Sequence, residues 1–201
     1  MIKIRRNTFE TNSSSMHSLV IMKNGHECTK EEMEEDLYIS KDGIYRIWSE
    51  EDIMFERYPF DILSTPSDKF RYLIASFSHS EEKRKEIIKA FLDVEKDIKE
   101  IEFPKNWDSE EPFYGSIDHQ SDGFIAKYID ENKISFKEFL FDTKYKIVID
   151  GDEYGIWEKM KEAGLINTNE IDVDINPCDI NYLSEVDKED LEDFFSNNET
   201  R

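Results

Sequence analysis

Apolar residues follow two patterns along this chain: short runs typical of strands near both ends, and helical spacing in the middle. The runs in His17–Met22 and Lys144–Asp150 predict buried strands. Across Ser67–Phe77 and Ser80–Ile101, apolar side chains recur on one side of a helix, with lysines and glutamates on the other. The chain therefore predicts two long amphipathic helices between strands, the second ending before Pro104.

Local signals add shorter elements to this plan. The segments Thr29–Glu32 and Ser135–Glu138 match the capping box, which predicts short helices after Thr29 and at Ser135–Phe141. Lys41-Asp42-Gly43 predicts a hairpin turn between Leu37–Ser40 and Ile44–Trp48. Further strands are predicted at Ile2–Phe9, Tyr114–Asp118 and Ile171–Ile175, and further helices at Ser49–Arg57, Ser121–Tyr128, Glu153–Ala163 and Ser184–Phe195.

Strands at both ends around a helical middle predict an α+β fold with a mixed or mostly antiparallel sheet. No linker rich in glycine, serine or proline interrupts the 201 residues. We therefore expect a single domain, residues 1–201, with an acidic C-terminal region from about residue 170.

The three tryptophans lie in different settings. Large aromatic side chains bury much apolar area, so we expect Trp48 and Trp157 to pack in or against the core. Trp107 lies in an acidic loop with several other aromatic residues. Trp107 is therefore predicted to anchor a protein partner.

Charge changes this picture more than any motif does. The formal net charge is −21, from 47 acidic and 26 basic residues. A surface this negative repels phosphate backbones, so direct nucleic-acid binding is not expected. The excess suits a basic protein partner, imitation of nucleic-acid charge, or a solvated acidic surface with no partner.

Other compositional features point to the cytoplasm. Cys28 and Cys178 are far apart in sequence and have no zinc-ligand spacing, so we expect reduced thiols. No apolar run approaches the length of a membrane span. We expect a cytoplasmic protein with no membrane contact and no cofactor.

The most concentrated polar chemistry is the serine-rich loop Phe9–Ser18. Hydroxyls, amides and backbone N–H groups in such a loop can hold phosphate oxygens, and His17 can transfer protons near neutral pH. The alternative is a structural loop whose polar side chains hydrogen-bond their own backbone. The predicted phosphate ligands are Arg6, Asn12, Ser13, Ser14, Ser15 and, from a later segment, Ser121.

Two further segments carry candidate chemistry. In Asp118–Ser121, the His-x-Ser spacing places His119 and Ser121 on one side of an extended chain. His119 can pair with His17 as a catalytic couple, or it can satisfy polar groups at a helix start. The carboxylates of Asp150–Glu153 can hold Mg²⁺ or Ca²⁺, but Asp152 also suits a helix cap. We favour the cap and predict no metal.

The opening of the chain resembles a known group of proteins. Lys3-Ile-Arg-Arg6, followed by Phe9-Glu-Thr-Asn-Ser-Ser-Ser15 and His17-Ser18, is similar to the start of uncharacterised phage and prophage proteins. Segments Ile117–Ser121 and Ile149–Glu153 resemble later parts of that group. The resemblance implies an origin in a mobile element, but no activity or catalytic residue.

Together these observations predict a phage or mobile-element accessory protein. It would bind and inhibit a basic host protein that handles nucleic acid or acts in defence, through its acidic surface. Besides Trp107, the predicted partner-binding residues are Asp187, Glu189, Asp190, Glu192 and Asp193. The alternative is a phosphate- or nucleotide-binding protein, or a phosphoester-processing enzyme, that uses the serine-rich loop and His17.

Overall fold

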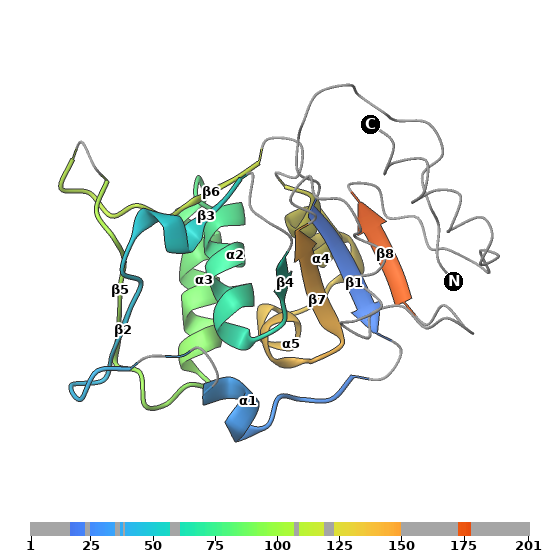
Figure 1. Ribbon diagram of the computed structural model, residues 1–201, viewed down its shortest axis with the longest axis horizontal. Helices are drawn as coiled ribbons and strands as arrows, with labels where there is room; N and C mark the ends of the chain where they lie inside the picture. Colours follow the sequence, from blue (N-terminus) through green and yellow to red (C-terminus); the bar gives the residue numbers. More distant parts are fainter. Residues whose placement is uncertain are drawn as a thin grey trace. The chain divides into compact units, whose positions relative to one another are not determined.

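A computed structural model describes residues 17–22, 25–34, 37, 39–56, 61–106, 109–118, 123–149 and 173–177. They form helices with antiparallel and parallel strand pairs, so the predicted α+β fold is confirmed (Figure 1). The chain forms two compact units: unit 1 (Met1–Gly25, Arg57–Leu63, Lys144–Arg201) and unit 2 (His26–Glu56, Ser64–Thr143). The single domain stays a prediction. The elements predicted at Ile2–Phe9, Glu153–Ala163 and Ser184–Phe195 lie outside the described residues.

Unit 1 contains a four-stranded sheet in the order β4-β7-β1-β8 (Figure 1). Its strands are β1 (His17–Met22), β4 (Asp61–Leu63), β7 (Tyr145–Ile149) and β8 (Val173–Pro177). All three pairings are antiparallel. Leu19 and Val20 are both fully buried although consecutive strand residues point to opposite faces. The apolar runs therefore predicted β1 and β7 correctly.

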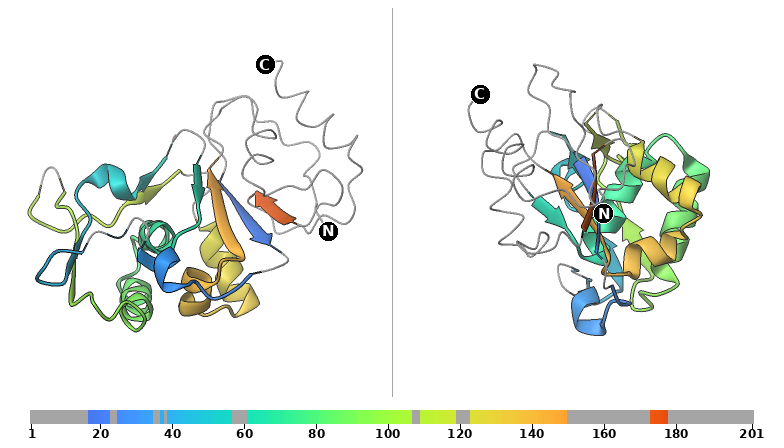
Figure 2. Two further views of the ribbon diagram at one scale, coloured as in Figure 1. Left: turned by 60° about the horizontal axis from the view of Figure 1, so that its bottom comes forward. Right: turned by 90° about the vertical axis from the view of Figure 1, so that its right-hand side faces the viewer.

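Unit 2 is built on helices that meet in an aromatic cluster. In the left view of Figure 2, α2 (Pro66–Ser76) and α3 (Glu81–Leu92) are seen end-on beside one another. Phe70 of α2 stacks on Phe91 of α3 with ring centroids 4.3 Å apart, and Phe91 lies 5.9 Å from Phe141. Phe141 ends α5 (Phe136–Phe141), so three helices share one aromatic core.

Side-chain caps fix where the helices of unit 2 begin. The hydroxyl of Thr65 accepts a hydrogen bond from the Asp68 N–H, and Pro66 occupies the first helical turn of α2. Ser80 caps α3 in the same way. The capping box predicted at Thr29–Glu32 is present, with both reciprocal bonds formed, and it starts α1 (Lys30–Glu34).

Short parallel pairs complete unit 2. Strand β2 (Ile44–Arg46) pairs with β5 (Glu100–Glu102), and β3 (Met54–Phe55) pairs with β6 (Ser116–Ile117). The predicted turn before Ile44 is confirmed, because the Gly43 N–H donates to the Ser40 carbonyl at 2.9 Å.

Several predicted boundaries were wrong. The second long helix ends at Leu92 rather than at Ile101, because the chain turns there and residues 100–102 pair with β2. The helix predicted at Ser49–Arg57 is a short 3-10 helix, η1 (Glu50–Ile53), followed directly by β3. The helix predicted at Ser121–Tyr128 is α4 (Phe124–Asn132), which begins after Gly123. The last predicted strand is β8, which is shifted toward the C-terminus.

Gly115 sits where no other residue fits. Its φ is +92°, and a Cβ there would lie 2.3 Å from the Ile53 carbonyl oxygen and 2.8 Å from the Ala75 Cβ. We predict that Gly115→Ala lowers the free energy of unfolding by about 3 kcal/mol, from backbone strain and overpacking together. Chemical denaturation followed by circular dichroism measures this loss.

Gly123→Ala is the matched control. Gly123 also has a positive φ, +78°, but a Cβ added at this position would meet no other atom within 4 Å. This variant should lose only about 1 kcal/mol, from the backbone conformation alone. Equal losses in the two variants would show that Gly115 does not make the close approach described above.

Candidate functional site

His17, the predicted proton-transfer residue, begins β1 opposite Ile149 of β7. Its side chain is fully buried, so the imidazole is closed to solvent in this arrangement. The other residues of the predicted phosphate and catalytic site lie outside the described residues: Arg6, Asn12, Ser13, Ser14, Ser15, His119 and Ser121. The same is true of Asp150–Glu153 and of the predicted partner-binding residues Trp107, Asp187, Glu189, Asp190, Glu192 and Asp193. These roles stay predictions.

One cluster in unit 2 joins a carboxylate, an imidazole and a hydroxyl. Nε2 of His26 lies 3.1 Å from Oε2 of Glu32, and Nδ1 lies 3.1 Å from Oγ1 of Thr143. A carboxylate only accepts, so Nε2 of His26 is the donor to Glu32. We call these three residues the His26 clasp.

The carboxylate, imidazole and hydroxyl of the His26 clasp follow one another as in a nucleophilic triad, but the hydroxyl is hydrogen-bonded to the backbone. Oγ1 of Thr143 accepts from the His26 N–H at 2.9 Å and lies 3.1 Å from the His26 carbonyl oxygen. The Thr143 N–H also donates to that carbonyl, at 2.8 Å. The cluster therefore ties two distant segments together, and we assign it a structural role.

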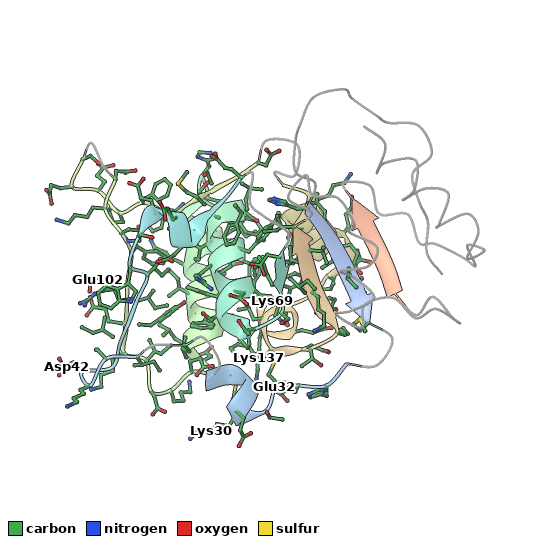
Figure 3. The ribbon with its side chains drawn as sticks, in the orientation of Figure 1. Lys30, Glu32, Asp42, Lys69, Glu102 and Lys137 are labelled. Carbon is green, nitrogen blue, oxygen red and sulfur yellow. The ribbon has the colours of Figure 1, made fainter. Side chains whose placement is uncertain are left out.

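Beside the His26 clasp, a thiol and an ammonium group are buried. Lys69 is fully buried and its Nζ donates to the Asp142 carbonyl oxygen at 3.0 Å. Burial raises the pKa of the Cys28 thiol, and the charge of Lys69 opposes this only partly. Cys28 is therefore a protonated core residue at neutral pH rather than a nucleophile. Figure 3 shows Lys69 on α2 and Glu32 on α1.

Metal-binding clusters and membrane-spanning helices are both absent from the described residues. No group of three or more histidine, cysteine, aspartate or glutamate side chains there is placed to hold a metal ion. None of the helices in the described segments combines the length and apolar character needed to cross a membrane.

Trp48 departs from the sequence prediction. Its side chain is 62% exposed, and it is the one large hydrophobic side chain exposed among the described residues. Strand β2 ends at Arg46, but the Ile47 N–H still bonds the Glu102 carbonyl, so the alternation of the strand continues past its end. Tyr45 and Ile47 are buried, while Arg46 is half-buried and Trp48 is exposed. The expectation that Trp48 packs in the core was wrong.

The outward side of the β2–β5 pair forms an ordered surface. The guanidinium of Arg46 lies over the Trp48 ring, 4.9 Å from the centroid, and both its Nε and an Nη lie 2.6 Å from Oε2 of Glu102. Ile44 and Glu100 lie on the same side of the pair. We call Ile44, Arg46, Trp48, Glu100 and Glu102 the Trp48 face.

Backbone and buried contacts hold the Trp48 face in place. Oδ2 of Asp52 accepts from the Trp48 N–H and from the Ser49 N–H, each at 3.0 Å, where η1 begins. The Ile47 N–H donates to the Glu102 carbonyl at 2.9 Å. On the inner side, the Tyr45 hydroxyl lies 2.9 Å from Oγ of the fully buried Ser67. The indole is thus presented from a rigid segment.

Exposed carboxylates occur across unit 2 but differ in their pairing. On the helices, several pair with lysines of the same segment, as Glu81 does with Lys85 at 2.5 Å and Asp93 with Lys89 at 2.6 Å. Among the described residues, Glu100 of the Trp48 face has no ion-pair partner. Breaking an exposed ion pair costs little free energy. Paired and unpaired carboxylates are therefore both accessible to a cationic partner.

Comparison with known proteins adds no relative. Neither a protein-family model, nor a curated protein, nor a solved structure matches this chain.

The His26 clasp makes stability depend on pH through Glu32. The Thr29 N–H, and then the side chain of His26, hold the pKa of Glu32 below its ordinary 4.5. This stabilisation is present above pH 4.5 and is lost as the pH falls through the lower folded-state pKa. We predict that Glu32→Gln is less stable than wild type at pH 7, and that the difference narrows when the pH is lowered to 3.

The effect should be small, within about 1 kcal/mol, because Glu32 is partly exposed. Denaturant titrations at both pH values measure it. Glu31→Gln, an exposed position in the same helical turn, is the control and should show no such pH-dependent difference. An equal response of the two variants would contradict the role given to Glu32.

Proposed function

We propose that this protein binds a positively charged protein through its acidic surface and blocks that partner. The observation that carries the proposal is the net charge of −21 on a chain that also forms an apolar core. Exposed carboxylates on α1, α3, α4 and β5 support it, because they are available to a partner without unfolding.

The proposed mechanism is electrostatic occupation of a phosphate-binding groove. Carboxylates spaced along the C-terminal region would take the places of nucleic-acid phosphates on the partner. Charge complementarity of this kind mainly accelerates association and selects the partner, and salt weakens it. In the setting that the phage resemblance implies, the partner is a host protein that handles nucleic acid or acts in defence.

The electrostatic mechanism makes a prediction about salt. A basic protein captured by the tagged full-length chain from bacterial lysate at 50 mM NaCl should be lost at 500 mM. With that protein purified, its association rate constant should fall by tenfold or more between these salt concentrations, because steering is screened. A DNA duplex should compete for the same groove. Stopped-flow fluorescence and competition assays measure both effects.

Matched charge variants locate the binding carboxylates. One variant carries Asp187→Asn, Glu189→Gln, Asp190→Asn, Glu192→Gln and Asp193→Asn. The control carries the same loss of charge at exposed positions of unit 2, namely Glu27→Gln, Glu31→Gln, Glu82→Gln, Glu111→Gln and Glu131→Gln. The first variant should bind more weakly than the second. Equal weakening would reject the C-terminal mechanism, and a complex indifferent to salt would reject the electrostatic proposal itself.

A further inference from the structure

We infer that the Trp48 face is a docking site for an arginine-bearing segment of the basic partner. This inference rests on the proposed function and names a contact surface for it that is separate from the C-terminal carboxylates. In the proposed contact, a partner guanidinium lies on the exposed indole of Trp48, and its charge is matched by Glu100 and the neighbouring carboxylates.

The first support is the exposure of a rigid aromatic side chain. Trp48 is 62% exposed, although burying an indole would be strongly favourable. Its backbone N–H is bonded by Asp52 and its ring lies against the Arg46 guanidinium, and both contacts reduce the conformational freedom to be lost on binding. Exposed, preorganised tryptophans beside arginine are the residue types that dominate binding energy at protein interfaces.

The second support is that the face already holds one guanidinium over an indole. Arg46 lies 4.9 Å from the ring centroid of Trp48 and is fixed by Glu102. This internal contact shows that the site chemistry suits a planar cation on the ring and a carboxylate at its edge. Because Glu102 neutralises Arg46, the further carboxylate of Glu100 leaves the face with a net negative charge.

The third support is the surrounding charge. Figure 3 shows Glu102 and Asp42 on the side of the β2–β5 pair that faces away from α2 and α3. Lys41 and Lys99 are exposed on the same hairpin and strand segments, so the excess negative charge of the face itself comes from Glu100 and Glu102 against Arg46. Carboxylates beside an aromatic ring favour a cationic segment over an acidic one. Charge complementarity therefore commits the face to a basic occupant rather than to a second copy of this acidic chain.

The test uses the full-length protein and a fluorescein-labelled nona-arginine peptide at 50 mM NaCl. Fluorescence anisotropy should show that Trp48→Ala raises the dissociation constant for the peptide about fivefold. This is the size expected for an exposed cation–π contact. Glu100→Gln should weaken it more than Glu82→Gln, which removes the same charge from α3. Circular dichroism should show that all three variants remain folded, since these side chains lie at the surface.

A second measurement reports the site directly. The three tryptophans give three indole N–H resonances in a ¹H–¹⁵N spectrum, and Trp48→Phe identifies the one from residue 48. That resonance should shift most as nona-arginine is added.

The outcomes separate the two proposals. If the wild-type protein binds the peptide in a salt-dependent way but Trp48→Ala binds equally well, the docking site is wrong and the acidic-binding proposal stands. If the wild-type protein does not bind the peptide, the docking site is also wrong, and the salt series with the captured partner decides the proposed function. If Trp48→Ala instead converts a dimer to a monomer in sedimentation, the face joins copies of this chain and the inference is overturned.

Discussion

The stacked rings of Phe70, Phe91 and Phe141 are the contact on which unit 2 depends. Each ring comes from a different helix, and Tyr45 brings β2 to the same cluster with its ring 6.0 Å from Phe91. Without this cluster, α2, α3 and α5 would be short helices with little reason to form in water. The cluster also decides which way β2 faces. Because Tyr45 and Ile47 point inward, the alternating residues Arg46 and Trp48 point outward.

This link between core and surface is the main functional lesson of the structure. A protein rich in carboxylates gains solubility at every surface position, but specificity needs a few fixed groups. Here the fixed groups lie on β2 and β5 and on Trp48, two residues beyond the end of β2, where the Ile47 N–H still bonds the Glu102 carbonyl. The inner side chain of Tyr45 in this segment is held by the aromatic cluster and by the hydroxyl of Ser67. The order of the Trp48 face therefore depends on the packing of the core beneath it.

The sequence predicted local features well and distant pairings poorly. The predicted capping box at Thr29–Glu32 and the predicted helix start at Ser80 are both present, because capping signals act within a few residues. The end of α3 was missed because Val94, Ile98 and Ile101 continue the helical spacing. Pairing of Glu100–Glu102 with β2 overrides that spacing, and no nearby residue signals it.

The same limit applies to the candidate sites. No local pattern marks the His26 clasp, because Thr143 lies 117 positions from His26. The prediction for Trp48 failed for a different reason. Its large apolar side chain favoured burial, but its place in the alternation Tyr45, Arg46, Ile47, Trp48 favoured exposure. That alternation was a usable signal. For the serine-rich loop and the C-terminal carboxylates, which lie outside the described residues, the sequence remains the only guide.

The register of the four-stranded sheet has a consequence for synthesis in the cell. Strand β1 pairs with β7, so His17 meets Ile149 only after more than 130 further residues have been made. At ordinary translation rates, the apolar run of β1 waits roughly ten seconds on the ribosome for its partner. During that interval a fully buried segment of the finished protein is open to chaperones and to other nascent chains. The abundant negative charge carried by the intervening residues keeps such an intermediate dispersed while it waits.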